Sequence, residues 1–288
     1  MSVSAAELAS THQAWLDCLN EKRWDDLQKY VNSKYIHGRQ ELTPEGFVTH
    51  IQNVSAAIGV STIHVDTMLI DEKNQCVADI LYTKINPTIP FLSPEPTGRE
   101  LMLREFRFVW FKNGKFSKAT MLVNSDDLRK QMTDPDYHHE LDLVSEWPTP
   151  TGASRLSKEE LEAVFRGYVD TAVARRTDSD LADYIHAELT FNKNVLALDD
   201  YRKGVVDLQT AIPDLQVQVE ALVVQEETQR VAARLLISGT PVAEWGGLAT
   251  GRAMVLPEHS LYQVVDGKIQ QVFSIGDLDS AKQSQQQP

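Results

Sequence analysis

The chain has 288 residues, of which 42% are hydrophobic and 24% are charged, a composition typical of globular proteins. This length fits two domains of ordinary size, each able to bury a core of its own. The formal net charge of −13 argues against a nucleic-acid partner, because phosphate binding requires clustered Lys and Arg. It also argues against adsorption to anionic membranes.

The sequence shows no sign of a membrane or secretory segment. No apolar run approaches the roughly 20 residues that cross a bilayer, and the N-terminal residues lack the pattern of a signal peptide, so we expect a cytoplasmic location. Cys18 and Cys76 are the two cysteines. They are too few for a disulfide framework and are expected to be free thiols. No metal-ligand spacing links the histidines, so no metal site is predicted.

The elements of the first half follow a simple order. An amphipathic helix carries Trp15 at helical spacing with other apolar residues, and Thr43-Pro44 predicts the start of a later helix. The strands predicted after these helices span residues 63–70, 75–85, 101–111 and 116–123. The Asn113-Gly114 pair predicts a tight hairpin between the last two strands.

The second half repeats the first at an offset of 153–154 residues, which indicates that one structural unit occurs twice. Ser157 and Glu160 form a capping box at the start of its first helix, on which Tyr168 aligns with Trp15. Both aromatic residues are expected in the core. Strands are predicted over residues 215–224, 230–238, 254–265 and 269–275. Helices followed by an antiparallel sheet predict the α+β class.

The domain boundaries are predicted from composition. We expect one domain over residues 1–135 and a second over residues 157–282. The segment 136–156 is rich in Pro, Asp, Ser and Thr and is predicted to be a linker. The Gln-rich end, residues 283–288, is predicted to be a flexible tail.

Short motifs of the second copy carry a family resemblance. They are, in order, Ile212-Pro213-Asp214-Leu215, Ser238-Gly239-Thr240, Thr250-Gly251-Arg252 and Asp266-Gly267-Lys268-Ile269. The first copy keeps Pro94-Glu95-Pro96-Thr97-Gly98-Arg99 and Asn113-Gly114-Lys115. In this order and spacing both copies resemble the SnoaL-like domain family of the NTF2-like superfamily.

The resemblance implies two cone-shaped α+β barrels in tandem, each a curved antiparallel sheet packed on helices with a pocket at one end. Such domains commonly pair sheet to sheet. The two copies are therefore expected to form an intramolecular pseudo-dimer, with independent cones as the alternative and a homodimer left open. Activities of the superfamily include polyketide cyclases, isomerases, dehydratases and epoxide hydrolases, and they generally use no cofactor.

The acid/base pair of the polyketide cyclases is missing from both copies. In those enzymes an Asp on the last strand works with a His across the final hairpin. The motif alignment places Ser274 and Ser260 at these positions, and Met121 and Arg107 in the first copy. An unassisted Ser does not titrate near neutral pH, so it cannot transfer protons as a carboxylate does.

Strand alternation nominates the residues that face the pocket. The candidate catalytic residues are Glu105, Arg107, Ser260, Tyr262 and Ser274. The candidate ligand contacts are Glu258, His259, Gln270, Trp245, Phe111 and Met121. If the strand register shifts by one residue, the opposite face lines the pocket, including Arg104, His259, Gln263 and Gln271.

The Glu105 and Arg107 pair has two interpretations. In one, Glu105 transfers a proton and Arg107 stabilises a developing enolate or oxyanion. In the other, the two side chains form a salt bridge at the mouth of the cone. His259 is either an acid/base residue or a hydrogen-bonded structural residue.

The sequence thus predicts a cofactor-independent enzyme of the cyclase, isomerase or dehydratase type. Its ligand is expected to be a hydrophobic small molecule, such as a polyketide- or terpenoid-like intermediate. The alternative is a non-catalytic small-molecule-binding or scaffold protein that has lost the acid/base pair. A third possibility divides the roles, with one active copy and one structural copy.

Overall fold

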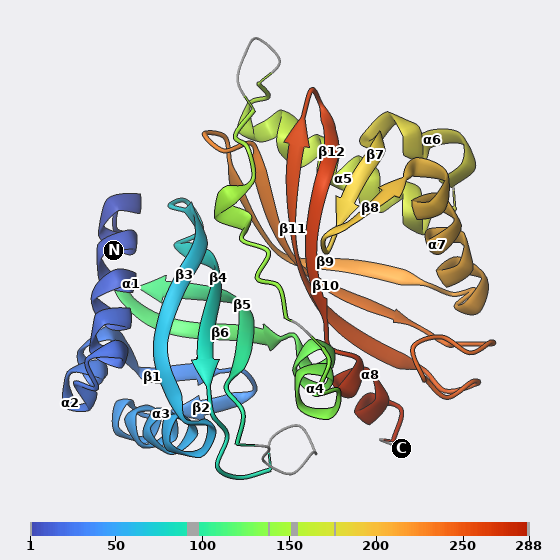
Figure 1. The fold of residues 1–288 in the computed structure, drawn as a ribbon. Coiled ribbons are helices and arrows are strands. Elements are labelled where there is room, and N and C mark those ends of the chain that lie inside the picture. The colour runs from blue at the N-terminus through green and yellow to red at the C-terminus, as the bar shows by residue number, and fades with distance from the viewer. Residues whose placement is uncertain (1, 91–97, 138, 151–154, 176, 287–288) are drawn as a thin grey trace. The chain divides into compact units, whose positions relative to one another are not determined.

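The computed structural model describes residues 2–90, 98–137, 139–150, 155–175 and 177–286 (Figure 1). It divides into two compact units, Met1–Ser145 and Glu146–Pro288, here called unit 1 and unit 2. Within the motif Pro94–Arg99, the residues Pro94 to Thr97 lie outside the described residues. The same holds for residues 138 and 151–154 of the predicted linker and 287–288 of the predicted tail.

Unit 1 places its helices mostly before a six-stranded sheet. Its elements are α1 (Ala5–Asn20), α2 (Trp24–Leu27), the 3₁₀ helix η1 (Gln28–Tyr30), β1 (Val31–His37), β2 (Gln40–Leu42), α3 (Pro44–Ile58), β3 (Val60–Asp71), β4 (Cys76–Ile85), β5 (Leu101–Lys112), β6 (Lys115–Val123) and α4 (Ser125–Thr133). The strand order is β2-β1-β6-β5-β4-β3. β1 pairs with β6 in parallel, and the other neighbours are antiparallel.

Unit 2 repeats this plan. After the 3₁₀ helix η2 (Val144–Glu146), its elements are α5 (Lys158–Val173), α6 (Thr177–Tyr184), β7 (Ile185–Phe191), β8 (Asn194–Ala197), α7 (Leu198–Ala211), β9 (Gln216–Gln225), β10 (Arg230–Gly239), β11 (Met254–Val265), β12 (Lys268–Gly276) and α8 (Leu278–Ser284). The strand order, β8-β7-β12-β11-β10-β9, matches that of unit 1 position by position. The predicted duplication and the α+β class, with two curved sheets each packed with helices, are confirmed.

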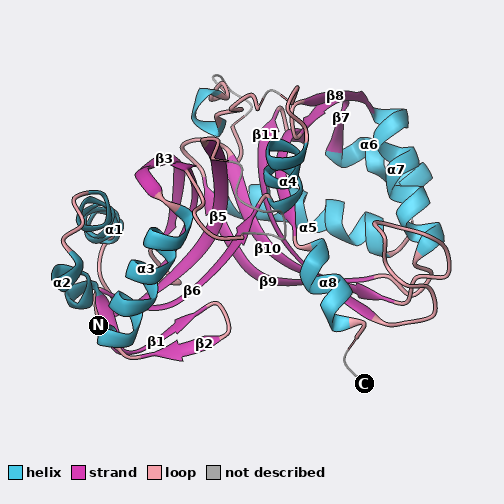
Figure 2. Cartoon of the chain, turned by 60° about the horizontal axis from the view of Figure 1, so that its bottom comes forward, coloured by secondary structure: helices cyan, strands magenta, loops and turns pink. Residues whose placement is uncertain are grey.

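In each unit the helices α1–α3 or α5–α7 pack against one curved sheet (Figure 2). In unit 1 the buried face of α1 includes Trp15, Leu16 and Leu19, and in unit 2 that of α5 includes Leu161 and Phe165. The predicted capping box of Ser157 and Glu160 is present, and α1 has an equivalent one. The prediction of four strands per copy is incomplete, because the short strands β1, β2, β7 and β8 were missed. Their polar, half-exposed residues give no clean alternation.

The predicted hairpins form, but a bulge follows each of them. Both turn residues of each Asn113-Gly114 and Asp266-Gly267 pair have positive φ, as a tight hairpin requires. The β11–β12 register shifts between Gln263 and Val264, and the β5–β6 register shifts between Trp110 and Phe111. A bulge inserts one residue and so reverses the face of every side chain beyond it.

The C-terminal end is ordered further than predicted. α8 includes residues 283 and 284, and the side chain of Gln285 is only 7% exposed. Gln285 accepts a hydrogen bond from the backbone N–H of Ala249 at 2.8 Å and donates one to its carbonyl at 2.9 Å. The prediction of a flexible tail from residue 283 is therefore wrong for these residues, because a paired side chain fixes them.

The boundary between the units, after Ser145, lies inside the segment predicted as a linker. The backbone N–H groups of Val144 and Ser145 both donate to the carboxylate of Asp66 at 2.9 Å, which fixes this segment to unit 1. The bounds of the predicted linker, residues 136–156, stay a prediction. Among the described residues, no helix is long and apolar enough to cross a bilayer.

Candidate functional site

Each unit contains a cavity, of about 360 Å³ in unit 1 and about 370 Å³ in unit 2. We call them cavity 1 and cavity 2. Their walls combine many apolar side chains with a few polar ones, the usual character of small-molecule sites. The polar and charged lining residues of cavity 1 are Tyr35, His37, His50, Ser55, Thr83, Glu105 and Arg107. Those of cavity 2 are Tyr168, Asp200, Tyr201, Glu258 and Tyr262.

A glutamate lines each cavity at the same place in the two copies. Glu105 on β5 and Glu258 on β11 are each half-buried and line their cavities. Two residues after Glu105, Arg107 pairs with Met121 of β6. Two residues after Glu258, Ser260 pairs with Ser274 of β12. Burial raises the pKa of Glu105, although the charge of Arg107 opposes this shift in part. Burial also raises the pKa of Glu258. Both side chains are therefore able to gain and lose a proton closer to neutral pH than an exposed glutamate.

Arg107 is held by an acidic residue that the sequence analysis missed. Its Nε donates to Asp79 Oδ1 at 2.9 Å, and its Nη2 donates to Asp79 Oδ2. His12 Nε2 lies 2.6 Å from the same Oδ2. At this distance His12 Nε2 donates a hydrogen bond to the carboxylate. The 3.0 Å contact between His12 Nε2 and Arg107 Nη2 is therefore a contact between two donors that share Asp79 Oδ2 as acceptor. All three side chains are buried.

The charges within this cluster are balanced internally. Burial alone would raise the pKa of Asp79, but Arg107 and His12 lower it well below its usual range. The guanidinium of Arg107 also lies 4.8 Å from the centroid of the Trp15 ring. The cluster fixes the Arg107 guanidinium, which forms part of the wall of cavity 1.

The predicted salt bridge between Glu105 and Arg107 does not form, because Asp79 occupies the guanidinium. Among the described residues, Glu105 has no hydrogen bond or ion pair. Arg107 Nη1 makes no hydrogen bond to a described residue either. A carboxyl group and a fixed guanidinium thus line the same cavity with hydrogen-bonding capacity left over.

Two histidines line cavity 1 beside this pair. The His37 and His50 ring centroids lie 5.0 Å apart, and the Tyr35 hydroxyl lies 3.4 Å from His37 Nδ1. Burial, together with the nearby His50 and Arg107, lowers the pKa of His37 to about 4. His37 is therefore neutral near pH 7 and can offer one donor and one acceptor.

In unit 2 the glutamate meets hydroxyl groups instead of a cation. Ser260 Oγ donates to Glu258 Oε1 at 2.6 Å and lies 3.0 Å from Ser274 Oγ. These hydrogen bonds oppose, but do not cancel, the rise that burial causes in the pKa of Glu258. Neither serine is among the residues that line cavity 2. The structure thus places Ser260 and Ser274 as supports of Glu258.

Tyrosines make up the other polar part of cavity 2. The hydroxyls of Tyr168 and Tyr201 lie 2.6 Å apart. Burial raises the pKa of Tyr168 to about 12 and that of Tyr201 well above its usual range. It does the same to Tyr262, the predicted catalytic tyrosine, which does line the cavity. Trp15 lies in the core of unit 1 and Tyr168 packs against the core of unit 2, as predicted, and each also lines its cavity.

Of four further predicted ligand contacts, two line a cavity and two do not. Trp245 lines cavity 2 and Met121 lines cavity 1. Phe111 does not line cavity 1; it packs edge-to-face on Phe116 in the core, at 4.8 Å between ring centroids. Gln270 does not line cavity 2, because the bulge turns Ile269 into the core in its place.

His259 lies on the opposite face of β11 and is fully buried there. Its Nε2 lies 2.7 Å from Arg234 Nη1, and Arg234 pairs with Glu220 at 2.7 Å. His259 is therefore not among the residues that line cavity 2, and its structural interpretation fits the contacts. The alternative register also fails, since Glu105 and Glu258 line the cavities and Arg104 does not.

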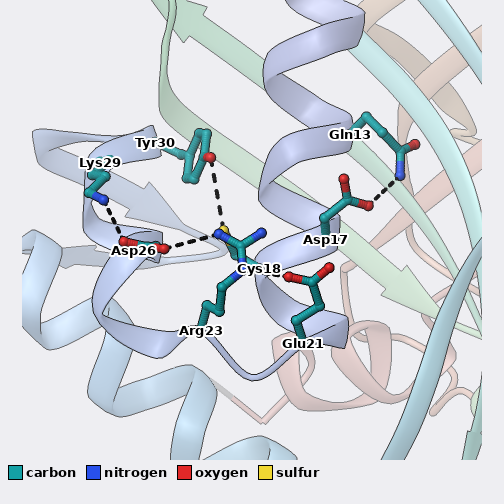
Figure 3. Close-up of polar contacts among 8 residues, drawn as sticks. All are labelled: Gln13, Asp17, Cys18, Glu21, Arg23, Asp26, Lys29 and Tyr30. Carbon is teal, nitrogen blue, oxygen red and sulfur yellow. Dashed lines mark hydrogen bonds and ion pairs between the residues drawn. The ribbon is translucent and has the colours of Figure 1, made fainter.

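The remaining residues of note carry less chemistry. Cys18 and Cys76 are both buried and free, as predicted, and Cys18 Sγ lies 3.9 Å from the Tyr30 hydroxyl (Figure 3). Within the described part of the chain, no group of three or more His, Cys, Asp or Glu side chains could hold a metal ion. A sequence signal for Asp79 does exist, because it is the single charge in the apolar run Cys76–Leu81.

The family model of SnoaL-like polyketide cyclases matches residues 163–285, within unit 2. The match covers most of unit 2. A comparison with curated proteins gives no match. Unit 1 repeats the strand order of the SnoaL-like unit and so contains a second copy of its fold.

Solved structures similar to this chain include a SnoaL-like polyketide cyclase from Agrobacterium tumefaciens, with 28% identity, a TM-score of 0.40, and coverage of 43% of this chain and 95% of that chain. TsrD from Streptomyces laurentii shows 19% identity and a TM-score of 0.41, over 45% of this chain and 96% of that chain. IdmH from Streptomyces antibioticus shows 18% identity and a TM-score of 0.39, over 43% of this chain and 96% of that chain.

Proposed function

We propose that the protein is an acid/base enzyme of the cyclase, isomerase or dehydratase type that acts on a hydrophobic small molecule in cavity 1. One observation carries the proposal. The Glu105 carboxyl lines an apolar cavity without a hydrogen-bond partner among the described residues, and the fixed guanidinium of Arg107 lines the same cavity. Proton transfer next to a stabilised oxyanion needs these two kinds of group.

The chemistry follows from the two side chains. The Glu105 carboxylate removes a proton from a carbon next to a carbonyl group, and the carbonyl oxygen gains negative charge. Arg107 Nη1 donates a hydrogen bond to that oxygen, and the two hydrogen bonds to Asp79 hold the guanidinium in place. The protonated Glu105 then returns the proton to a second carbon, which isomerises the substrate. In a cyclase, the enolate carbon instead attacks the carbon of a second carbonyl group of the same molecule, and the oxygen of that group takes the proton from Glu105.

The alternative is a small-molecule-binding or scaffold protein without catalysis. Side chains that plug the cones would favour a scaffold, whereas the open volumes of about 360 and 370 Å³ favour ligand binding. The Met121 and Phe111 side chains, which could have filled cavity 1, leave it open. The distinction between binding and catalysis therefore depends on proton transfer by Glu105.

Proton exchange of a simple ketone tests the proposal. The full chain is incubated with 2-tetralone in D₂O, and the loss of its α-proton signals is followed by NMR. Glu105→Gln should reduce the protein-dependent rate by about 100-fold or more. Glu100→Gln is the control, because Glu100 is exposed and pairs with Lys84 at 2.7 Å. The wild-type rate should rise with pH through a pKa above that of an ordinary glutamate.

Two results would count against the proposal. If Glu105→Gln exchanges the ketone protons as fast as the wild type, Glu105 is not the base. If Glu258→Gln loses the activity and Glu105→Gln keeps it, the reaction belongs to unit 2. The pairing of the units as a pseudo-dimer, a homodimer, the cytoplasmic location, the absence of a cofactor and the polyketide- or terpenoid-like nature of the substrate stay predictions.

A further inference from the structure

The tyrosine pair of cavity 2 has a hydroxyl proton to spare. Tyr168 and Tyr201 carry two protons, and their 2.6 Å contact uses one of them. Whichever hydroxyl donates, the accepting hydroxyl keeps its own proton. Among the described residues neither hydroxyl has another hydrogen-bond partner. Because both side chains line cavity 2, the spare proton is available to an acceptor inside it.

The charges of cavity 2 differ from those of cavity 1. Among the described residues that line it, none is Lys, Arg or His, and the two ionisable carboxyls are Glu258 and the exposed Asp200. The residue two positions after the glutamate that both copies share is Arg107 in unit 1 and Ser260 in unit 2. An anionic ligand would lose its hydration in cavity 2 and find no counter-charge there.

The shape of cavity 2 also has a specific origin. Gly204 of α7 lines the cavity, and a Cβ added there would meet no atom within 4 Å. Its counterpart on α3 is His50, whose imidazole lines cavity 1. The missing side chain leaves room next to Tyr201, one turn before it on the same helix.

We propose that cavity 2 is a second ligand site, which binds a neutral, largely apolar molecule through a carbonyl oxygen that accepts the spare proton of the Tyr168–Tyr201 pair. The Glu258 carboxyl closes the same wall, supported by Ser260 and Ser274. This site does not depend on proton transfer at Glu105. The two copies therefore differ in ligand class as well as in residues, with a cationic wall in cavity 1 and a hydroxyl wall in cavity 2.

Three naphthalenes of nearly the same shape test the ligand class by calorimetry on the full chain. They are 2-acetylnaphthalene, which has a carbonyl oxygen, 2-ethylnaphthalene, which lacks it, and the anion 2-naphthoate. The acetyl compound should bind about five- to tenfold more tightly than the ethyl compound, as expected for one hydrogen bond. The anion should bind more weakly than the acetyl compound.

Variants then locate the site. The double variant Tyr168→Phe/Tyr201→Phe should bring the acetyl-to-ethyl affinity ratio close to one, because both hydroxyls are gone. Tyr184→Phe, which removes a hydroxyl that does not line cavity 2, should keep the ratio. Gly204→Leu should weaken all three compounds by tenfold or more by filling the cavity. Using a ratio of affinities keeps the comparison valid even if a variant is less stable.

Several outcomes would overturn the inference. These are a wild-type ratio near one, a ratio that survives in the double tyrosine variant, tighter binding of 2-naphthoate that is lost in Gly204→Leu, and unchanged binding of the acetyl compound in Gly204→Leu. Tighter binding of 2-naphthylmethylammonium would show instead that Glu258 selects a cation. A wild-type chain without a carbonyl preference that still exchanges the ketone protons would defeat this inference and leave the proposed function standing.

Discussion

Glu105 and Glu258 occupy the same position in the two copies, yet one lines a cavity beside a guanidinium and the other accepts a hydrogen bond from a serine hydroxyl. The duplication has kept the carboxyl group and changed what surrounds it. A neighbouring cation favours the charged carboxylate, whereas burial favours the neutral acid. The two sites are thus suited to different tasks with the same residue.

We expect Asp79→Asn to destabilise unit 1 by about 3–5 kcal/mol, because it leaves the buried Arg107 without its counter-charge. Arg107 and Asp79 are joined by two hydrogen bonds, and both are buried. Urea unfolding of the full chain measures the effect. The surface pair Asp126 and Arg129, at 2.9 Å, is the control, and Asp126→Asn should cost less than about 1 kcal/mol. Equal costs for the two substitutions would show that the cluster is not a buried ion pair.

Glu258→Gln should stabilise unit 2 at alkaline pH and leave its stability unchanged at acid pH. The pKa of Glu258 is raised in the folded state, so the folded protein binds this proton more tightly than the unfolded chain does. The stability that this proton contributes is complete below the unfolded pKa of about 4.3. It is lost as the pH rises through the folded pKa. Glutamine does not ionise and escapes this loss.

The melting temperature at pH 4 and pH 8 measures this difference. The gain of Glu258→Gln over the wild type should be larger at pH 8, whereas Glu244→Gln, at an exposed position, should give the same small change at both values. An equal gain at both pH values would mean that the substitution acts through packing and that the pKa of Glu258 is not raised.

The parts of the fold that depend on neighbouring residues could be predicted from the sequence. Asn113-Gly114 specifies its hairpin through backbone conformation, and the expected pairing of Ser260 with Ser274 across the other hairpin is present. The alternation failed for Gln270, because a bulge is set by the packing of the whole sheet and leaves no residue signature here.

The candidate site was predictable only in part. Glu105, Arg107 and Glu258 lie on the predicted inner face, so alternation was sufficient to find them. The partners of Arg107 come from α1 and β4, and their approach depends on how helix and sheet pack. Likewise nothing local distinguishes a tyrosine that lines a cavity, such as Tyr168, from one that fills a core.

A glutamine at positive φ fastens the start of each copy's first helix to its sheet. In unit 2, Gln229 Oε1 accepts from the N–H of Leu156 at 2.7 Å, and its Nε2 donates to the Leu156 carbonyl at 2.8 Å. Gln75 makes the same two bonds to Val3, at 2.8 and 2.7 Å. Their φ values are 56° and 50°, where a side chain other than glycine is strained.

We therefore expect Gln229→Ala to destabilise unit 2 by about 2 kcal/mol, because it removes both hydrogen bonds and keeps the strain. Gln229→Gly should cost about 1 kcal/mol less than Gln229→Ala, since glycine adopts positive φ freely. Urea unfolding gives the order, and hydrogen exchange of the Leu156 N–H should speed up in both variants. Gln75→Ala should cost less than Gln229→Ala, because Gln75 is half-buried and Gln229 is only 1% exposed. If the alanine variant proves more stable than the glycine variant, backbone strain does not limit this position.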